Sequence, residues 1–260
     1  MPFAGRHYFE ELGEGFPLVL IHGHTLDHRM WAAAAPSLAA AGYRVIMPDM
    51  AGHGRSGAPP MGTTLAGDLA ELLDSLGVNG AVVAGLSMGG AVAVNFALRF
   101  PVLCAALIAV DSALFGYRFA DWPSTKPYVA IARSEGLAKG LEAWLADPLF
   151  RPAMASAAVA SQVRAIISKY PGTSWLQPVP SPVAAGPFDV ERLADIDAPT
   201  LVLTGELDLP DFQRISEKLA AEIPGAQRRV IAGAGHLLPM EQPDGFTQAV
   251  LQFLDDLQGR

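Results

Sequence analysis

The chain has 260 residues, of which 51% are hydrophobic, and a formal net charge of −8. This length lies within the range of one large α/β domain, so we expect no second independent domain. An acidic chain offers no basic stripe that could neutralise phosphates, which argues against a nucleic acid partner.

The sequence also lacks the usual marks of export or membrane insertion. Cys104 is the single cysteine, so no internal disulfide can form. The N-terminal residues lack the apolar core of a signal peptide, and no apolar run reaches the ~18 residues that a membrane span requires. We therefore expect a cytoplasmic protein without membrane contacts.

Strands and helices alternate along most of the chain, as a mostly parallel sheet requires. Strands are predicted at residues 6–11, 17–21, 43–47, 80–84, 103–110, 200–204 and 228–231. Helices are predicted at residues 30–41, closed by Gly42, at 64–76, with Thr63 as a possible cap and Gly77 past its end, and at 91–100, stopped by Pro101. The alternation stops after Asp111 and resumes at Thr200.

A short turn carrying Ser87 lies between the predicted strand 80–84 and the helix that follows it. The sequence reads Gly85-Leu86-Ser87-Met88-Gly89-Gly90. A strained turn that raises a serine hydroxyl between a strand and a helix needs neighbours without a Cβ. A serine between glycines is often a turn residue without a catalytic role. A serine between a buried strand and a helix, however, is typical of a nucleophile elbow. It predicts that Ser87 forms a covalent acyl intermediate.

A base and an acid must accompany the serine, because a hydroxyl is a weak nucleophile until its proton is removed. His236 follows the predicted strand 228–231, and Asp208 follows the predicted strand 200–204. The chain order Ser87, Asp208, His236 is that of an α/β-hydrolase triad and differs from the chymotrypsin-like and subtilisin-like orders. The competing acids are Glu206, Asp211 and, on the loop after the preceding strand, Asp111.

These motifs, with His22-Gly23 after the second predicted strand and the run at residues 49–56, resemble the α/β-hydrolase superfamily in its serine esterase and lactonase type. Residues 23–31 are similar to the oxyanion loop of bacterial aryl esterases, perhydrolases and 3-oxoadipate enol-lactonases. The resemblance covers nearly the whole chain and implies a mostly parallel eight-stranded sheet, with helices on both faces and a helical cap after the sixth strand. The core would span residues 1–111 and 196–260, and the cap residues 112–195.

The resemblance further implies an oxyanion hole made of the backbone amides of His24 and Met88. His22 is expected to pack beneath the site, and Asp49 and His53 to stabilise a structural turn. The histidines at positions 22, 24, 28 and 53 lack the His-x-x-x-His spacing with a glutamate that a zinc site uses. We predict neither a metal nor a cofactor.

The predicted cap is rich in aromatic residues and prolines. Prolines at 171, 178, 180, 182 and 187 make its second half a connector and not a strand. The aromatic residues of this segment would then face an apolar substrate pocket; they are Trp122, Tyr128, Trp144, Phe150 and Trp175. The pocket candidates are Trp122, Trp144 and Trp175, together with Leu237 beside the predicted base. The alternative for each is that it only packs the cap against the core.

The sequence thus predicts a serine hydrolase that cleaves a small apolar carboxylic ester or lactone through an acyl-enzyme. A carbon–carbon bond hydrolase, a perhydrolase or a hydroxynitrile lyase would use the same triad. A non-catalytic ligand-binding protein on a hydrolase scaffold is the alternative from another class. The acyl and alcohol specificity, the stereoselectivity and the oligomeric state stay open.

Overall fold

Eight strands form one sheet in the computed structural model, which describes residues 3–58, 62–122, 124–177 and 188–259. In spatial order they are β1-β2-β4-β3-β5-β6-β7-β8. Their bounds are β1 Phe3–Ala4, β2 His7–Leu12, β3 Phe16–Ile21, β4 Tyr43–Pro48, β5 Ala81–Leu86, β6 Cys104–Val110, β7 Thr200–Gly205 and β8 Gln227–Ile231. Strand β2 runs antiparallel to β1 and β4, and the other neighbours are parallel. The predicted eight-stranded, mostly parallel sheet is confirmed, with β1 as the strand that the sequence pattern did not indicate.

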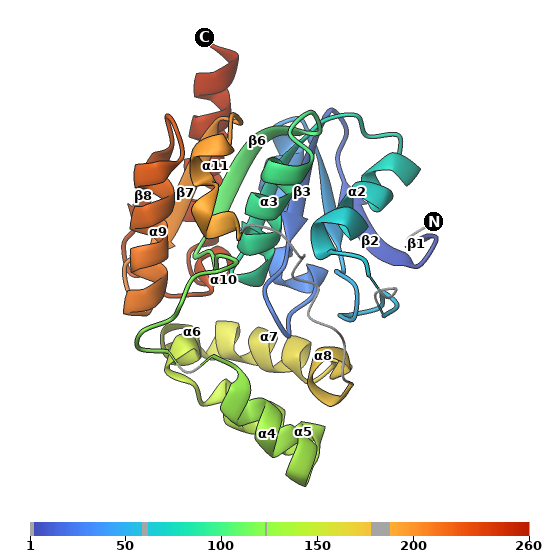
Figure 1. The fold of residues 1–260 in the computed structure, drawn as a ribbon, viewed down its shortest axis with the longest axis vertical. Coiled ribbons are helices and arrows are strands. Elements are labelled where there is room, and N and C mark those ends of the chain that lie inside the picture. Colours follow the sequence, from blue (N-terminus) through green and yellow to red (C-terminus); the bar gives the residue numbers. More distant parts are fainter. Residues whose placement is uncertain (1–2, 59–61, 123, 178–187, 260) are drawn as a thin grey trace.

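The central strands are apolar along their length because helices cover both faces of the sheet. Every residue of β5 and of β7 is buried. Helix α2 (Leu65–Ser75) packs on α3 (Met88–Arg99), which covers β5 and β6 (Figure 1). On the other face, α1 (Ala35–Ala40) packs on β4 and contacts α11 (Pro243–Gln258), which also packs on β7 and β8. Helix α9 (Pro210–Glu222) follows β7, and the short α10 (Leu238–Glu241) follows β8.

The predicted helix at residues 30–41 is wrong in extent. The structure has a 3-10 helix, η1 (His28–Trp31), followed after a break by α1. Pro36 is the cause, since a proline inside a continuous helix lacks the N–H for a hydrogen bond and clashes with the carbonyl four residues earlier. In the first turn of α1 the same proline is tolerated.

Two other helices begin at different residues from those predicted. Helix α2 is capped by Thr64 and not by Thr63, because the Thr64 Oγ1 accepts a hydrogen bond from the N–H of Gly67 (3.0 Å). Helix α3 begins at Met88, three residues before the predicted start at 91, so that the serine turn leads into it without a linker.

A group of helices replaces the strand–helix rhythm between β6 and β7, as expected of a cap after the sixth strand. They are α4 (Lys126–Glu135), α5 (Leu137–Leu145), η2 (Pro148–Phe150), α6 (Arg151–Ala155), α7 (Ala157–Ile167), α8 (Thr173–Leu176), η3 (Asp189–Glu191) and η4 (Leu193–Asp195). Figure 1 shows α4 to α8 gathered at one end of the sheet, far from the C-terminus of the chain. Of the five prolines named above, only Pro171 belongs to the described residues. The cap bounds of 112 and 195 stay a prediction.

No helix within the described ranges combines the length and the apolar character needed to cross a membrane.

Candidate active site

Ser87 occupies a strained turn between β5 and α3. Its backbone has φ 55° and ψ −112°, in the left-handed half of the map that a non-glycine residue rarely adopts. Hydrogen bonds hold it there: its N–H donates to the carbonyl of Val110 (3.0 Å), and its own carbonyl accepts from Ala91 and Ala113 (both 3.0 Å). The turn places the Ser87 side chain at the end of the central strand, where it lines a cavity.

The glycines around Ser87 are there because the backbone on both sides is too close for a side chain. A Cβ at Gly85 would overlap the carbonyl group of Gly89, and a Cβ at Gly89 would overlap the carbonyl oxygen of Ile21. A Cβ at Gly90 would overlap the Ser112 side chain. The sequence analysis expected neighbours without a Cβ at this turn, and the contacts agree. Most of the atoms that a Cβ would overlap belong to the backbone, which cannot rotate away as a side chain can.

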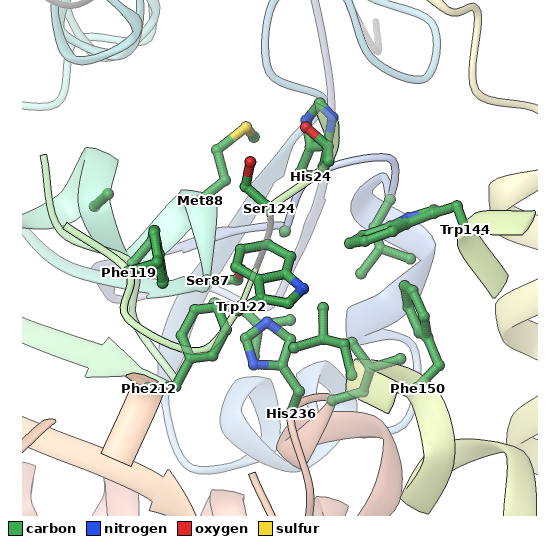
Figure 2. A pocket seen from close by; sticks show the side chains of 18 of the residues that line it. His24, Ser87, Met88, Phe119, Trp122, Ser124, Trp144, Phe150, Phe212 and His236 are labelled. Carbon is green, nitrogen blue, oxygen red and sulfur yellow. The ribbon is translucent and has the colours of Figure 1, made fainter. Parts of the chain in front are cut away.

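His236 and Asp208 form a buried pair beside this turn. The Nδ1 atom of His236 lies 3.0 Å from Oδ2 and 3.1 Å from Oδ1 of Asp208. The other ring nitrogen, Nε2, is buried and has no hydrogen-bond partner among the described residues. His236 lines the same cavity as Ser87, and Figure 2 shows both side chains at its wall. An imidazole held at one nitrogen and unpartnered at the other is arranged to exchange a proton with a group in the cavity.

The competing acids are engaged elsewhere. Glu206 accepts from the N–H of Gly233 (2.9 Å) at the edge of the His236 loop. Asp211 accepts from Arg214 (2.7 Å) and from three backbone N–H groups of the segment at 120–122. Asp111 accepts from the N–H of Gly205 (2.7 Å) and lies against Asp208, but no hydrogen bond joins it to His236. The structure therefore pairs the histidine with Asp208.

A carboxylate that had not been predicted as a site residue, that of Glu241, holds the loop around His236 by hydrogen bonds. Glu241 accepts from the N–H of Gly235 through Oε2 (2.7 Å) and from the N–H of Leu237 through Oε1 (2.9 Å). The two donors flank His236 in the chain, so Glu241 fixes the loop on both sides of the ring. A Glu five residues after the histidine carried no signal by itself in the sequence.

The loop after β3 reaches the cavity with Gly23 and His24. The His24 ring lies between the core and the cap: its Nε2 accepts from the indole Nε1 of Trp175 (2.8 Å). Burial, and then the nearby His22, lower the pKa of His24 to about 4, so the ring is neutral near pH 7. The next residue, Thr25, has φ 63° and accepts from the indole Nε1 of Trp144 (2.9 Å). Two cap tryptophans thus hold this loop.

The expected structural roles of the nearby polar residues agree with their contacts. His22 is fully buried: its Nδ1 bonds to the carbonyl of Gly23 (2.8 Å), and its Nε2 accepts from the N–H of Met50 (2.9 Å). Asp49 accepts from the backbone N–H (2.9 Å) and ring Nδ1 (2.7 Å) of His28, and from the N–H of Arg55 (2.7 Å). His53 is buried against the rings of His22, His24 and Tyr170.

The cavity has a volume of about 240 Å³ and an almost wholly apolar wall. Of the predicted pocket residues, Trp122, Trp144 and Leu237 line it, and so does Met88. Trp175 does not: it is buried behind His24. Phe150 also lines it, as expected of an aromatic residue of the cap, and Phe119 and Phe212 line it without having been predicted (Figure 2). Phe212 lies on α9, and no motif separates it from an ordinary core residue.

Two groups of side chains in the described part of the chain have the spacing of metal ligands. In the first, His7, Asp68 and Glu71, both carboxylates bind Arg6. In the second, the Asp27 carboxylate binds Arg29 (2.6 Å), while Asp49 has the donors given above. Cationic and N–H donors already use these oxygens, and the absence of a metal stays a prediction.

The fold and the paired histidine and aspartate beside an elbow serine define an α/β hydrolase. The model of the alpha/beta hydrolase family matches residues 18–249, and the chain belongs to this family.

Known relatives match almost end to end. A putative carbamate hydrolase, RutD, from Azorhizobium caulinodans is 33% identical, and the match covers 99% of both chains. The structure of a thermophilic esterase from Thermogutta terrifontis is 34% identical, with a TM-score of 0.80 over 96% of this chain and 93% of that one. The enol-lactonase of Burkholderia xenovorans is 27% identical, with a TM-score of 0.83 over 96% of each chain.

Proposed function

We propose that this protein is a serine hydrolase that cleaves a small, apolar carboxylic ester or lactone through an acyl-enzyme. The observation that carries the proposal is the buried Nε2 atom of His236, which has no hydrogen-bond partner in the described part of the chain. His236 and Ser87 line the same cavity, and Asp208 holds Nδ1 of the ring. The similarity to proteins named esterase and enol-lactonase supports the substrate class.

In the proposed reaction, Ser87 Oγ attacks the substrate carbonyl while His236 Nε2 accepts the hydroxyl proton. Asp208 keeps the proton of the imidazole on Nδ1 and stabilises the imidazolium that forms. His236 then protonates the leaving alkoxide, which departs from an ester and stays tethered in a lactone. Water attacks the acyl-enzyme by the reverse sequence and regenerates Ser87.

The backbone N–H groups of His24 and Met88 are proposed to bind the oxyanion of the tetrahedral intermediate. Both residues line the cavity beside Ser87, and Met88 is the first residue of α3. One such donor contributes about 2.7–4 kcal/mol to transition-state stabilisation in comparable sites. The hydrogen bonds from Trp144 and Trp175 to the loop of His24 support a donor of fixed position.

The cavity supports an apolar substrate with a short acyl group. Its wall carries aromatic side chains, and Ser87, His24, Ser124, Thr125 and His236 are the polar lining residues in the described part of the chain. A volume of about 240 Å³ lies below the roughly 300–1,000 Å³ of most ligand pockets, which favours a short acyl group. The single cysteine, Cys104, is buried and unpaired, which is compatible with a reducing compartment. We therefore propose that the protein acts in the cytoplasm.

The test is hydrolysis of p-nitrophenyl acetate and butyrate by wild-type protein and by Ser87→Ala. We expect a burst of p-nitrophenol with wild type, an acyl mass adduct on the peptide of Ser87, and a loss of kcat of about 10⁴-fold or more in the variant. A lactone and a carbamate belong in the same panel, the latter because a relative is named a putative carbamate hydrolase. Undiminished turnover by Ser87→Ala, without an adduct in wild type, would overturn the proposal.

A further inference from the structure

A second carboxyl group lies beside that of Asp208. Asp111 directly follows β6, is fully buried and has a backbone φ of 40°. Its N–H donates to the carbonyl of Leu203 (2.9 Å), and its Oδ1 accepts from the N–H of Gly205 (2.7 Å). Its other oxygen, Oδ2, is buried and accepts no hydrogen bond from any donor among the described residues. A buried oxygen of this kind needs a donor or a proton of its own.

The Asp111 and Asp208 carboxyl groups are neighbours on one turn: Asp111 accepts from the N–H of Gly205, and the carbonyl of Gly205 accepts from the N–H of Asp208 (3.2 Å). Two ionised carboxylates cannot share a buried contact without strong repulsion, whereas one proton between them makes a hydrogen bond. Asp208 has more donors: His236 Nδ1 contacts both of its oxygens, and the N–H of Leu209 donates to Oδ1 (2.7 Å). For Asp111, the N–H of Gly205 is the single donor found among the residues that the structure describes. The negative charge therefore belongs on Asp208 and the proton on Asp111.

We propose that Asp111 is a positioning residue that keeps its proton and donates it as a hydrogen bond to the Asp208 carboxylate. The pair then carries one negative charge, directed at His236. Asp208 is held on two sides, by the N–H of Leu209 and the O–H of Asp111, so its orientation toward the imidazole is fixed. The kinetic part of this inference rests on the proposed function, whereas the location of the proton does not.

The groups around Asp111 agree with a neutral acid. Burial, followed by the charge of Asp208, raises the pKa of Asp111 well above its ordinary value. Glu241, on α10, acts in the same direction. His236 is the group that becomes cationic in the proposed reaction, and its Nδ1 contacts Asp208 (3.0 Å). Deprotonation of Asp111 at high pH would place two charges in contact and disturb the acid that orients His236.

The test compares the same substitution at the two acids. In Asp111→Asn the amide oxygen still accepts from Gly205 and the amide N–H donates to Asp208, so we expect kcat/KM near pH 7 within about threefold of wild type. In Asp208→Asn the imidazole is held in the wrong tautomer, and kcat falls by about 10⁴-fold. Asp111→Leu keeps the size but removes the donor, and we expect a loss of about tenfold or more. If the leucine variant does not fold, the pH dependence and the infrared spectrum of Asp111→Asn, described next, still decide the question.

Two readouts separate this role from general packing. The alkaline decline of kcat/KM that follows loss of the Asp111 proton is absent from Asp111→Asn. The stability of Asp111→Asn relative to wild type rises with pH, starting from about 4, the ordinary pKa of an aspartate. The sign follows because, above that pH, the folded wild type binds a proton that the unfolded chain releases. Raising the pH therefore destabilises wild type but not the variant.

The proton itself is observed by infrared difference spectroscopy at pH 7 on protein with ¹³C-labelled aspartate carboxyls. Wild type minus Asp111→Asn should contain the carbonyl band of a protonated carboxyl group. A carboxylate band in its place would overturn the proposal, and so would an activity of Asp111→Asn as low as that of Asp208→Asn. Because the spectrum and the stability curves need no turnover, they test Asp111 even if the proposed ester hydrolysis fails.

Discussion

The floor of the cavity and its cap are held in place by different kinds of interaction. The floor consists of the loops after β3, β5 and β8, which carry His24, Ser87 and His236. It depends on backbone geometry: close glycine contacts, a positive φ at Ser87, and N–H groups of the histidine loop bound to Glu241. The cap depends on side chains, namely tilted and edge-to-face contacts between aromatic rings and indole hydrogen bonds. The proposed catalytic groups therefore lie where close backbone contacts leave no space for a larger side chain, and the proposed substrate wall lies where side chains can be exchanged.

The largest expected effect is the loss of stability caused by a methyl group added to a floor glycine. Gly89→Ala should lower the free energy of unfolding by about 3 kcal/mol, because the new Cβ overlaps the backbone carbonyls of Ile21 and His22. Gly80→Ala is the matched control, since a Cβ there meets nothing within 4 Å, and we expect a change below about 0.5 kcal/mol. Urea denaturation measures both. Equal free energies of unfolding for Gly89→Ala and Gly80→Ala would contradict the view that backbone contacts in the floor exclude a side chain at Gly89.

A charged acyl group tests the cap side of the comparison. Among the described residues that line the cavity there is no Lys, Arg, Asp or Glu. A substrate carboxylate would therefore be buried without a partner, which costs several kcal/mol. We expect kcat/KM for p-nitrophenyl hemisuccinate to be about 100-fold lower than for p-nitrophenyl butyrate, after correction for their rates with hydroxide. Similar values for the two esters would show that the acyl group lies outside this apolar wall.

Asp211 joins helix α9 of the core to the cap segment at residues 120–122, and its removal should give a smaller and pH-dependent effect. Burial opposes its ionisation, but the N–H groups of Ala120, Asp121 and Trp122 and the guanidinium of Arg214 outweigh burial and lower its pKa to about 2. A depressed pKa stabilises the folded state above the ordinary aspartate pKa of about 4, and this stabilisation is lost as the pH falls toward 2. Asp211→Asn should therefore cost roughly 2 kcal/mol at pH 7 and progressively less in acid.

Asp121→Asn is the control for that measurement, because the exposed Asp121 carboxylate binds the same arginine (2.6 Å) without holding any backbone. Its loss should change the free energy of unfolding by less than about 1 kcal/mol. Denaturation curves between pH 2 and 7 compare the two variants. A pH-independent difference between wild type and Asp211→Asn would argue against an ionised Asp211 as the link to the cap.

The sequence allowed the floor to be predicted far better than the cap. Ser87 and its neighbouring glycines are recognisable in the sequence because a single strained turn requires all of them within six residues. Asp208 and His236 could be identified from the order of the catalytic residues along the chain in the family. The cavity wall could not be predicted in the same way. Trp122, Trp144 and Trp175 look alike in the sequence, yet only the first two line the cavity. Phe119 and Phe212 reach it through tertiary packing, which no local pattern records.

The two indole hydrogen bonds from the cap to the loop of His24 have a consequence for protein engineering. Trp144 and Trp175 bind the side chains of Thr25 and His24, and the backbone of His24 is a proposed oxyanion donor. Exchanging the cap to alter the proposed acyl specificity would also replace Trp144 and Trp175, and with them these two hydrogen bonds. Chimeras that exchange the cap alone should therefore lose turnover along with the old selectivity, unless positions 24 and 25 are exchanged with it.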